Sequence, residues 1–281
     1  MIRMIIPLAV CTAAALAAHG VYGSFRYSDN VSLLTGTDDY QLDILNTWTI
    51  DYASMVLGMS AADNAILFVD DADTDERLYA ADPSDMSYAG HVSLLWSNAY
   101  PYGTTYCYNV PFVNDCGDGL IRYGVDFNES FANPFGATGR GMSSDGTHIW
   151  EVNGGGTSTA QVGRFNTDGT GFQYWELPGI NSQLSDMTIY PIAGSTGIAV
   201  TAYDPGTTHY VWFYQFDGSQ CVLLGSAELP SNNFTTGLAY SAYTGTWFVS
   251  YLEGSAWKVS EFDVQQTVLH QSTWAGIKYS F

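Results

Sequence analysis

The feature that most constrains the fold is a pattern of short strands and turns that recurs along the chain. In the clearest copy, residues 237–241, 246–252, 257–263 and 267–274 form four predicted strands in succession. These segments are rich in β-branched and aromatic residues, and turn-forming residues separate them. Similar copies begin near four earlier residues: Met55, Thr104, Gly141 and Met187. A recurring unit of four strands is typical of a β-propeller, in which each unit forms one blade.

Six places along the chain look like the end of a fourth strand, but only five copies are complete. The first such ending, at residues 45–48, has too little chain before it, and the last copy is followed by an extra predicted strand at 277–281. We therefore expect an all-β propeller of six four-stranded blades, in which the C-terminal strand and residues 25–48 share one blade. Such sharing would close the ring and cover open sheet edges. A five-bladed ring and a β-sandwich are the alternatives.

Three segments resemble the repeat of secreted bacterial six-bladed propellers of the TolB-like and NHL-like kind. They read GLAY at residues 237–240, TGTWFV at 244–249 and SSDGTHIW at 143–150. The resemblance concerns the fold, because propellers of this kind include lactonases, lyases, peptide-binding scaffolds and interaction modules.

A narrower resemblance links residues 234–238, which read FTTGL, to the glutamine cyclotransferases, a family of secreted five-bladed propellers. That family carries an acidic residue on the next strand, in a motif of the Tyr-Glu-Ser type. The corresponding strand here reads WFVS at 247–250 and has no carboxylate. No catalytic residue is therefore transferred from the resemblance.

The N-terminus has the layout of a secretory signal peptide over residues 1–23. Arg3 supplies a positive charge, residues 5–18 form an apolar run, and small or tolerated residues at 21–23 precede a cleavage site near Ser24. We expect residues 24–281 to form one propeller domain, secreted or periplasmic, monomeric and without a membrane span. The alternative is a buried N-terminal helix.

The expected compartment bears on the cysteines that remain after cleavage. Cys107 and Cys116 are close in sequence and flank a turn-rich stretch, so in an oxidising compartment we expect them to form a disulfide. Cys221 lies in an apolar run, which favours a buried free thiol.

The charge balance limits the partners. The chain has 28 acidic residues against 8 basic ones and a formal net charge of −20. A polyanion such as nucleic acid would be repelled, as would an anionic membrane surface. Cations, cationic partners and neutral glycans are compatible with this charge.

The strongest local motif is the acidic run at residues 70–76. Asp71, Asp73 and Asp75 have the alternate spacing of a calcium loop, and Asp82 is placed to act as a closing ligand. Clustered carboxylates suit Ca²⁺, which takes six to eight oxygen ligands. The glycine expected at the sixth position is Glu76 instead, so a solvated acidic turn is the alternative. Asp115 and Asp118 form a second, weaker candidate.

No sequence motif identifies a catalytic nucleophile or a phosphate-binding loop. The histidines of the mature chain fall in different copies, so we expect structural roles for His91, His148, His209 and His270. Most aromatic residues, such as Trp150, Trp212 and Trp247, are expected to pack between blades.

We therefore predict a non-catalytic binding propeller for an extracellular protein or glycan, with calcium as a possible structural ion. The alternative is a secreted hydrolase, lyase or glutamine-cyclotransferase-like enzyme with its site at the mouth of the channel. Carboxylates or histidines that meet on one face of the ring would favour the enzyme.

Overall fold

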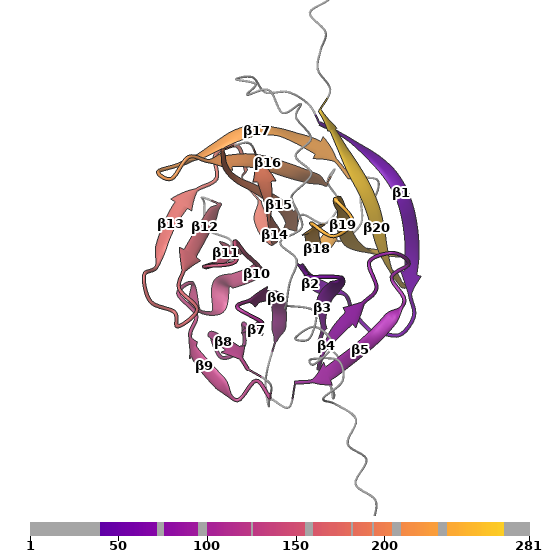
Figure 1. Ribbon diagram of the computed structural model, residues 1–281, viewed down its shortest axis with the longest axis horizontal. Coiled ribbons are helices and arrows are strands. Elements are labelled where there is room, and N and C mark those ends of the chain that lie inside the picture. Colours follow the sequence, from indigo (N-terminus) through magenta and orange to yellow (C-terminus); the bar gives the residue numbers. More distant parts are fainter. Residues whose placement is uncertain are drawn as a thin grey trace, which may run out of the picture.

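The computed structural model describes residues 40–266, apart from 72–75, 95–99, 125, 155–159, 181, 193, 204–208 and 230–234. Its five four-stranded antiparallel sheets surround a common axis and form a β-propeller (Figure 1). No helix in this part of the chain is long and apolar enough to cross a bilayer. The predicted signal peptide lies outside the described residues.

Four of the blades are continuous in sequence, and their strands follow one another from the axis outward. Blade 1 comprises β2 (Leu57–Ala62), β3 (Ala65–Asp70), β4 (Arg77–Ala81) and β5 (Tyr88–Ser93). Blade 2 comprises β6 (Pro101–Cys107), β7 (Val110–Asp115), β8 (Leu120–Tyr123) and β9 (Glu129–Ala132). After the short 3-10 helix η1 (Gly136–Thr138), blade 3 comprises β10 (Gly139–Ser144), β11 (Ile149–Asn153), β12 (Gln161–Phe165) and β13 (Gln173–Glu176). Blade 4 comprises β14 (Gln183–Ile192), β15 (Ser195–Tyr203), β16 (Tyr210–Phe216) and β17 (Cys221–Glu228).

Blade 5 joins the two ends of the described chain. It comprises β18 (Thr235–Ser241), β19 (Thr246–Glu253), β20 (Ala256–Gln266) and, as its outermost strand, the N-terminal strand β1 (Tyr40–Ile50). β1 pairs antiparallel with β20 from Tyr40 opposite Gln266 to Ile50 opposite Trp257. Figure 1 shows these two strands side by side at the edge of the ring.

The prediction of six blades was wrong, and the alternative of five is confirmed. Residues 45–48 end no separate blade, because they belong to β1 and supply the fourth strand of blade 5. The premise that N-terminal chain completes a C-terminal sheet is confirmed, although the strands that do so differ from those predicted. The segments 267–274 and 277–281, which we predicted as strands, lie outside the described residues.

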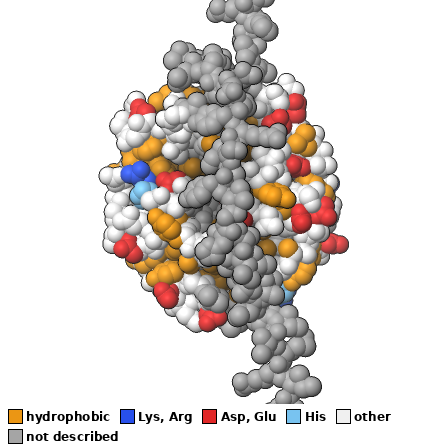
Figure 2. Space-filling model, in the orientation of Figure 1, with side chains coloured by type: hydrophobic (Ala, Val, Ile, Leu, Met, Phe, Trp, Pro, Cys, Tyr) orange, Lys and Arg blue, Asp and Glu red, His pale blue; other side chains and the backbone are white. Residues whose placement is uncertain are grey.

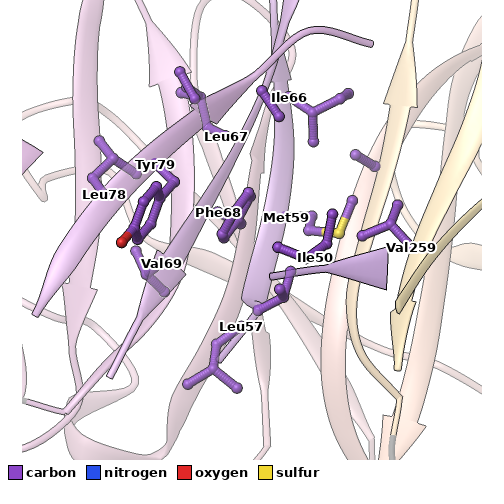
Figure 3. Close-up of a cluster of buried hydrophobic side chains, with 14 of the residues drawn as sticks. Ile50, Leu57, Met59, Ile66, Leu67, Phe68, Val69, Leu78, Tyr79 and Val259 are labelled. Carbon is purple, nitrogen blue, oxygen red and sulfur yellow. The ribbon is translucent and has the colours of Figure 1, made fainter. Parts of the chain in front are cut away.

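The hydrophobic core lies between neighbouring blades. Around blade 1, Phe68 and Met59 are fully buried and pack in one cluster with Ile50 of β1 and Val259 of β20 (Figure 3). Each fully buried side chain of this size stabilises the fold by about 1.5–3 kcal/mol. The expected packing role is confirmed for Trp150 and Trp247, whose exposed fractions are 1% and 6%.

The first strands of the five blades pack against one another around the axis, and the space between them is small. Each first strand has a β-bulge at the same level, and four of the five carry glycine there: Gly58, Gly103, Gly141 and Gly237. A Cβ on Gly103 would overlap the carbonyl oxygen of Arg140. At this level the ring therefore has room for backbone but not for five side chains.

The fifth first strand, β14, carries Asp186 at this level, and its side chain occupies the space that the glycines leave. Oδ2 of Asp186 accepts hydrogen bonds from the backbone N–H groups of Met59 at 2.7 Å and Leu238 at 2.6 Å. Oδ1 accepts one from Met187 at 2.8 Å, and a Cβ on Gly141 would overlap this oxygen. Asp186 thus links blades 1, 4 and 5 at the axis.

We expect Asp186→Asn to destabilise the ring. An amide has one acceptor oxygen where the carboxyl has two, so its NH₂ group must face at least one backbone N–H. A buried donor left without an acceptor costs about 1–3 kcal/mol. Urea denaturation should show this loss. The control is Asp63→Asn, which should leave stability unchanged because Asp63 lies in an exposed turn with a φ of 47° that Asn also favours. Equal stability of the two variants would contradict the linking role of Asp186.

Candidate active site

Buried acidic side chains gather at one end of the ring. Because the strands of a blade alternate in direction, the first strands begin and the second strands end at this same end. Asp70, Asp115 and Glu151 lie at or near the ends of the second strands β3, β7 and β11, and Asp186 lies near the start of β14. Their exposed fractions are at most 2%, which is unusual for carboxylates and requires a specific partner or role for each.

Glu151 is the one of these whose carboxyl is incompletely paired. Its Oε1 accepts hydrogen bonds from Asn114 Nδ2 at 2.9 Å and Asn133 Nδ2 at 2.7 Å. Its Oε2 is buried and has no hydrogen-bond partner among the described residues. Burial raises the pKa of Glu151 to about 8, against the opposing effects of the Asn133 hydrogen bond and the charge of Arg140. The group is therefore mainly a neutral acid at pH 7.

Local structure at the junction of blades 2 and 3 fixes this arrangement. Asn133 follows β9, and its Oδ1 accepts the backbone N–H of Phe135 at 2.8 Å, in a side-chain turn that leads into η1. Its Nδ2 also lies 3.0 Å from Asn114 Oδ1, so the two amides orient each other. Gly139 opens β10 next to the carboxyl, and a Cβ there would overlap Glu151 Oε1. Glycine at 139 therefore leaves the space that Glu151 fills.

Arg140 and Cys116 form the other side of this cluster. Arg140 Nη1 donates to the carbonyl oxygens of Gly139 at 2.8 Å and Ala137 at 3.0 Å, and its guanidinium lies over the Tyr102 ring, 5.4 Å from the centroid. The Cys116 thiol donates to the same Gly139 oxygen at 3.1 Å. Burial raises the pKa of Cys116 to about 12, so the thiol stays protonated and is a poor nucleophile.

Asp115 and Asp118, the weaker metal candidate, are paired with an arginine. Arg122 Nε donates to Asp115 Oδ2 and its Nη2 to Asp118 Oδ2, both at 2.7 Å. The two carboxylates therefore share one guanidinium, a cation of the protein itself, within blade 2.

The calcium prediction concerned Asp71, Asp73, Asp75 and Asp82. Asp73 and Asp75 lie outside the described residues, and Asp71 follows β3. Asp71 lies beside the start of β4, whereas Asp82 follows the end of that strand. Five residues at the rise of a β-strand separate the two by about 16 Å. Asp82 accepts the Ser84 backbone N–H at 2.9 Å, so it caps a turn and does not close a site with Asp71. Within the described ranges no group of three potential metal ligands is found. Calcium binding by the other three residues stays a prediction.

The predicted disulfide between Cys107 and Cys116 is not formed, and both cysteines are free. They lie at opposite ends of the β6–β7 hairpin. Cys107 pairs with Val110 next to the turn, whereas the N–H of Cys116 bonds the carbonyl oxygen of Tyr100 at the far end. Seven residues of extended strand span roughly 20 Å, and a disulfide needs Cα atoms within about 7 Å. The buried free thiol predicted for Cys221 is confirmed.

The described histidines lie on separate elements. His91 is on β5, where its Nδ1 is 2.7 Å from the Tyr88 hydroxyl, and His148 precedes β11, with Nδ1 3.4 Å from Asp145. His209 is buried just before β16 in blade 4, and His270 lies outside the described residues.

Sequence reasoning missed Glu151, although two signals pointed to it. A glutamate in a strand between the apolar residues Trp150 and Val152 is unusual. The triplet Trp150-Glu151-Val152 also places an aromatic residue and a glutamate on a second strand, as in the Tyr-Glu-Ser type motif, and follows Gly141-Met142 on the strand before. The resemblance at residues 234–238 points instead to the last copy, whose second strand has no carboxylate at residues 247–250.

Comparison with known proteins identifies the architecture. No protein-family model matches the sequence, and no curated protein matches it either. Among solved structures, the chain is similar to the glutaminyl cyclase of Myxococcus xanthus, with a TM-score of 0.61 and 10% identity over 82% of this chain and 99% of that one. It is less similar to a chain of a nidogen/laminin complex, with a TM-score of 0.49 and 11% identity over 71% and 73% of the two chains. For the gluconolactonase XC5397 of Xanthomonas campestris the TM-score is 0.45, at 13% identity over 77% and 89%. At such identities the likeness concerns the fold.

The raised pKa of Glu151 makes a prediction about stability. The folded chain holds the proton up to about pH 8, whereas an unfolded glutamate loses it near pH 4.5. The contribution of Glu151 to the free energy of unfolding is therefore largest below pH 4.5. It falls as the pH rises towards 8, by a few kcal/mol at most. In Glu151→Gln this contribution disappears.

Urea denaturation of both proteins at pH 5 and pH 8 tests this. The loss of stability between the two pH values should be smaller in Glu151→Gln than in the unmodified chain. Comparing the two proteins removes the contribution of other groups with raised pKa values, such as Asp186. Identical losses would mean that Glu151 titrates normally.

Proposed function

We propose that this protein is an enzyme in which Glu151 transfers a proton to and from a substrate bound at the end of the ring where the buried carboxylates gather. The observation that carries the proposal is the Glu151 carboxyl, which is fully buried and has one oxygen without a partner among the described residues. Leaving such an atom unpaired costs free energy, so a substrate group that completes its hydrogen bonding accounts for its persistence.

The hydrogen bonds distinguish the two oxygens of Glu151. Two side-chain amides donate to Oε1, so this atom acts as the carbonyl oxygen of a neutral acid. The proton then resides on Oε2, which is the unpaired atom. A pKa of about 8 lies close to neutral pH and allows the group both to give and to take a proton, as general acid–base catalysis requires.

Cyclisation of an amino-terminal glutamine is the reaction that we propose for this group. The substrate amine attacks its own side-chain carbonyl carbon, a C–N bond forms, and the bond to the amide nitrogen breaks to release ammonia. One carboxyl suffices, because it gives its proton to the leaving nitrogen and recovers one from the attacking nitrogen. The five-bladed architecture in common with a glutaminyl cyclase and the aromatic–glutamate pair on β11 support this choice.

A non-catalytic binding propeller for an extracellular protein or glycan is the second candidate. Exposed tyrosines favour it, since an aromatic face can stack on a sugar ring or serve as an anchor in an interface. Tyr100, Tyr108 and Tyr243 each expose more than 60% of their surface. Acidic side chains are scattered over the face shown in Figure 2, and they suit a cationic or neutral partner. In either role the protein acts outside the cytoplasm, after loss of residues 1–23.

Activity of the secreted chain on glutaminyl dipeptides tests the enzyme, with ammonia release as the measurement. Glu151→Gln should lower kcat by about 10²–10⁴-fold, the usual contribution of an acid–base group. Glu261→Gln is a matched control, because Glu261 is also buried but both its oxygens are bonded, to Asn46 and Thr246. Turnover that survives Glu151→Gln would contradict the assignment, and absence of turnover in the unmodified chain would favour the binding propeller.

Calcium binding by Asp71, Asp73 and Asp75 is a separate proposal. An ion bound only by the folded chain stabilises it, so the melting temperature should be higher with excess Ca²⁺ than with a chelator. The triple Asp→Asn variant should lose the difference. An unchanged transition in the unmodified chain would remove these three residues as ligands.

A further inference from the structure

Among the described residues of this strongly acidic protein, Arg140 is a cation without a carboxylate partner. The chain has only 8 basic residues against 28 acidic ones. Arg122 is paired with Asp115 and Asp118, and Lys258 with Glu253. Arg140 forms no salt bridge within the described part of the chain, although it lies beside Glu151.

The guanidinium of Arg140 is nevertheless held in place. Its Nη1 donates to two backbone carbonyl oxygens, and its plane lies over the Tyr102 ring. Its aliphatic stem passes Gly154, where a Cβ would overlap Arg140 Cγ. These contacts use one nitrogen and one face of the group, and Nε and Nη2 have no hydrogen-bond partner among the described residues. Within the described ranges, two adjacent N–H donors are thus held in place without a hydrogen-bond acceptor.

These donors belong to the same cluster as Glu151. Asn114 Nδ2 donates both to the carbonyl oxygen of Arg140, at 3.0 Å, and to Glu151 Oε1. Gly139, the residue before Arg140, lies against Glu151 Oε1, and Cys116 Sγ is 3.5 Å from Arg140 Nη1. In the part of the chain that the structure describes, an acid oxygen and a cationic fork without hydrogen-bond partners therefore belong to one cluster.

We infer that Arg140 binds a carboxylate of the substrate, so the substrate class is an acid and not a neutral amide or sugar. A guanidinium offers two parallel N–H donors that match the two oxygens of a carboxylate, and such charge-assisted pairs are stronger than neutral hydrogen bonds. This inference rests on the proposed function for the identity of the substrate. In that reaction it selects free glutamine, or a glutaminyl peptide with an acidic second residue.

A purely structural role for Arg140 makes a different prediction. Packing on Tyr102 and the bonds from Nη1 would stabilise the fold equally well with every ligand present. Only a ligand-binding role makes the affinity depend on a carboxylate.

Calorimetric titration with two matched pairs of probes distinguishes the roles without any need for turnover. The pairs are pyroglutamate with its primary amide, and acetate with acetamide. In the unmodified chain we expect the acids to bind at least tenfold more tightly than their amides. Arg140→Gln should abolish this preference, and Arg140→Lys should weaken it because the ammonium lacks the fork. Lys258→Gln, which removes a cation on β20, should leave it unchanged.

Glu151→Gln separates this inference from the proposed function. It should remove turnover and keep the preference for acids. If no variant turns over glutaminyl substrates but the preference is present and depends on Arg140, the carboxylate site stands and the cyclisation proposal fails. Equal binding of acids and amides by the unmodified chain would overturn the inference. So would a preference for acids that survives in Arg140→Gln, provided that the melting curve of this variant is unchanged.

Discussion

Five strands converge on the axis of the ring, and at one level the space between them excludes side chains on four of the five. Glycine meets this constraint in β2, β6, β10 and β18, and Asp186 of β14 fills the space that remains. Its carboxyl accepts hydrogen bonds from backbone N–H groups of three blades. At a bulge the regular sheet pairing leaves such N–H groups without an acceptor, and the carboxyl supplies one. Because the first strands position every blade, the packing between blades depends on this arrangement at the axis.

The same constraint places the candidate site. β10 runs past the axis with Gly141 against Asp186 and Gly139 against Glu151, so two glycines two residues apart each leave room for a buried carboxyl. Arg140 lies between them and turns its side chain towards Tyr102 of blade 2. A single strand therefore separates a carboxyl that is completely hydrogen-bonded and structural from one whose Oε2 has no hydrogen-bond partner among the described residues. The difference between Asp186 and Glu151 lies in their partners, since both are fully buried.

The strand–turn repeat predicted the four continuous blades closely, because each turn has a local signal in Gly, Asp or Asn and each strand in its apolar pattern. The number of blades depended instead on which strand completes the last sheet, a long-range pairing of Tyr40–Ile50 with Ala256–Gln266 that leaves no local signal. The disulfide prediction relied on closeness in sequence, whereas the hairpin register separates Cys107 from Cys116 by its full length. The candidate site was missed for a related reason. Glu151, Asn133 and Arg140 become neighbours only when blades 2 and 3 pack, and sequence spacing does not encode that contact.

The energetics of Glu151 distinguish the two candidate functions. A propeller that served only as a scaffold would gain stability if glutamine or an apolar residue replaced Glu151, because a carboxyl buried with one unpaired oxygen is destabilising above its usual pKa. The neighbouring Arg140 would relieve this cost by forming an ion pair, yet its Nη1 instead bonds backbone carbonyl oxygens. Over the described ranges, the fold thus keeps an acid oxygen and a cation in one cluster without pairing them, an arrangement that a bound substrate would complete. Local destabilisation of this kind is characteristic of active sites, where stability is lost in favour of reactivity.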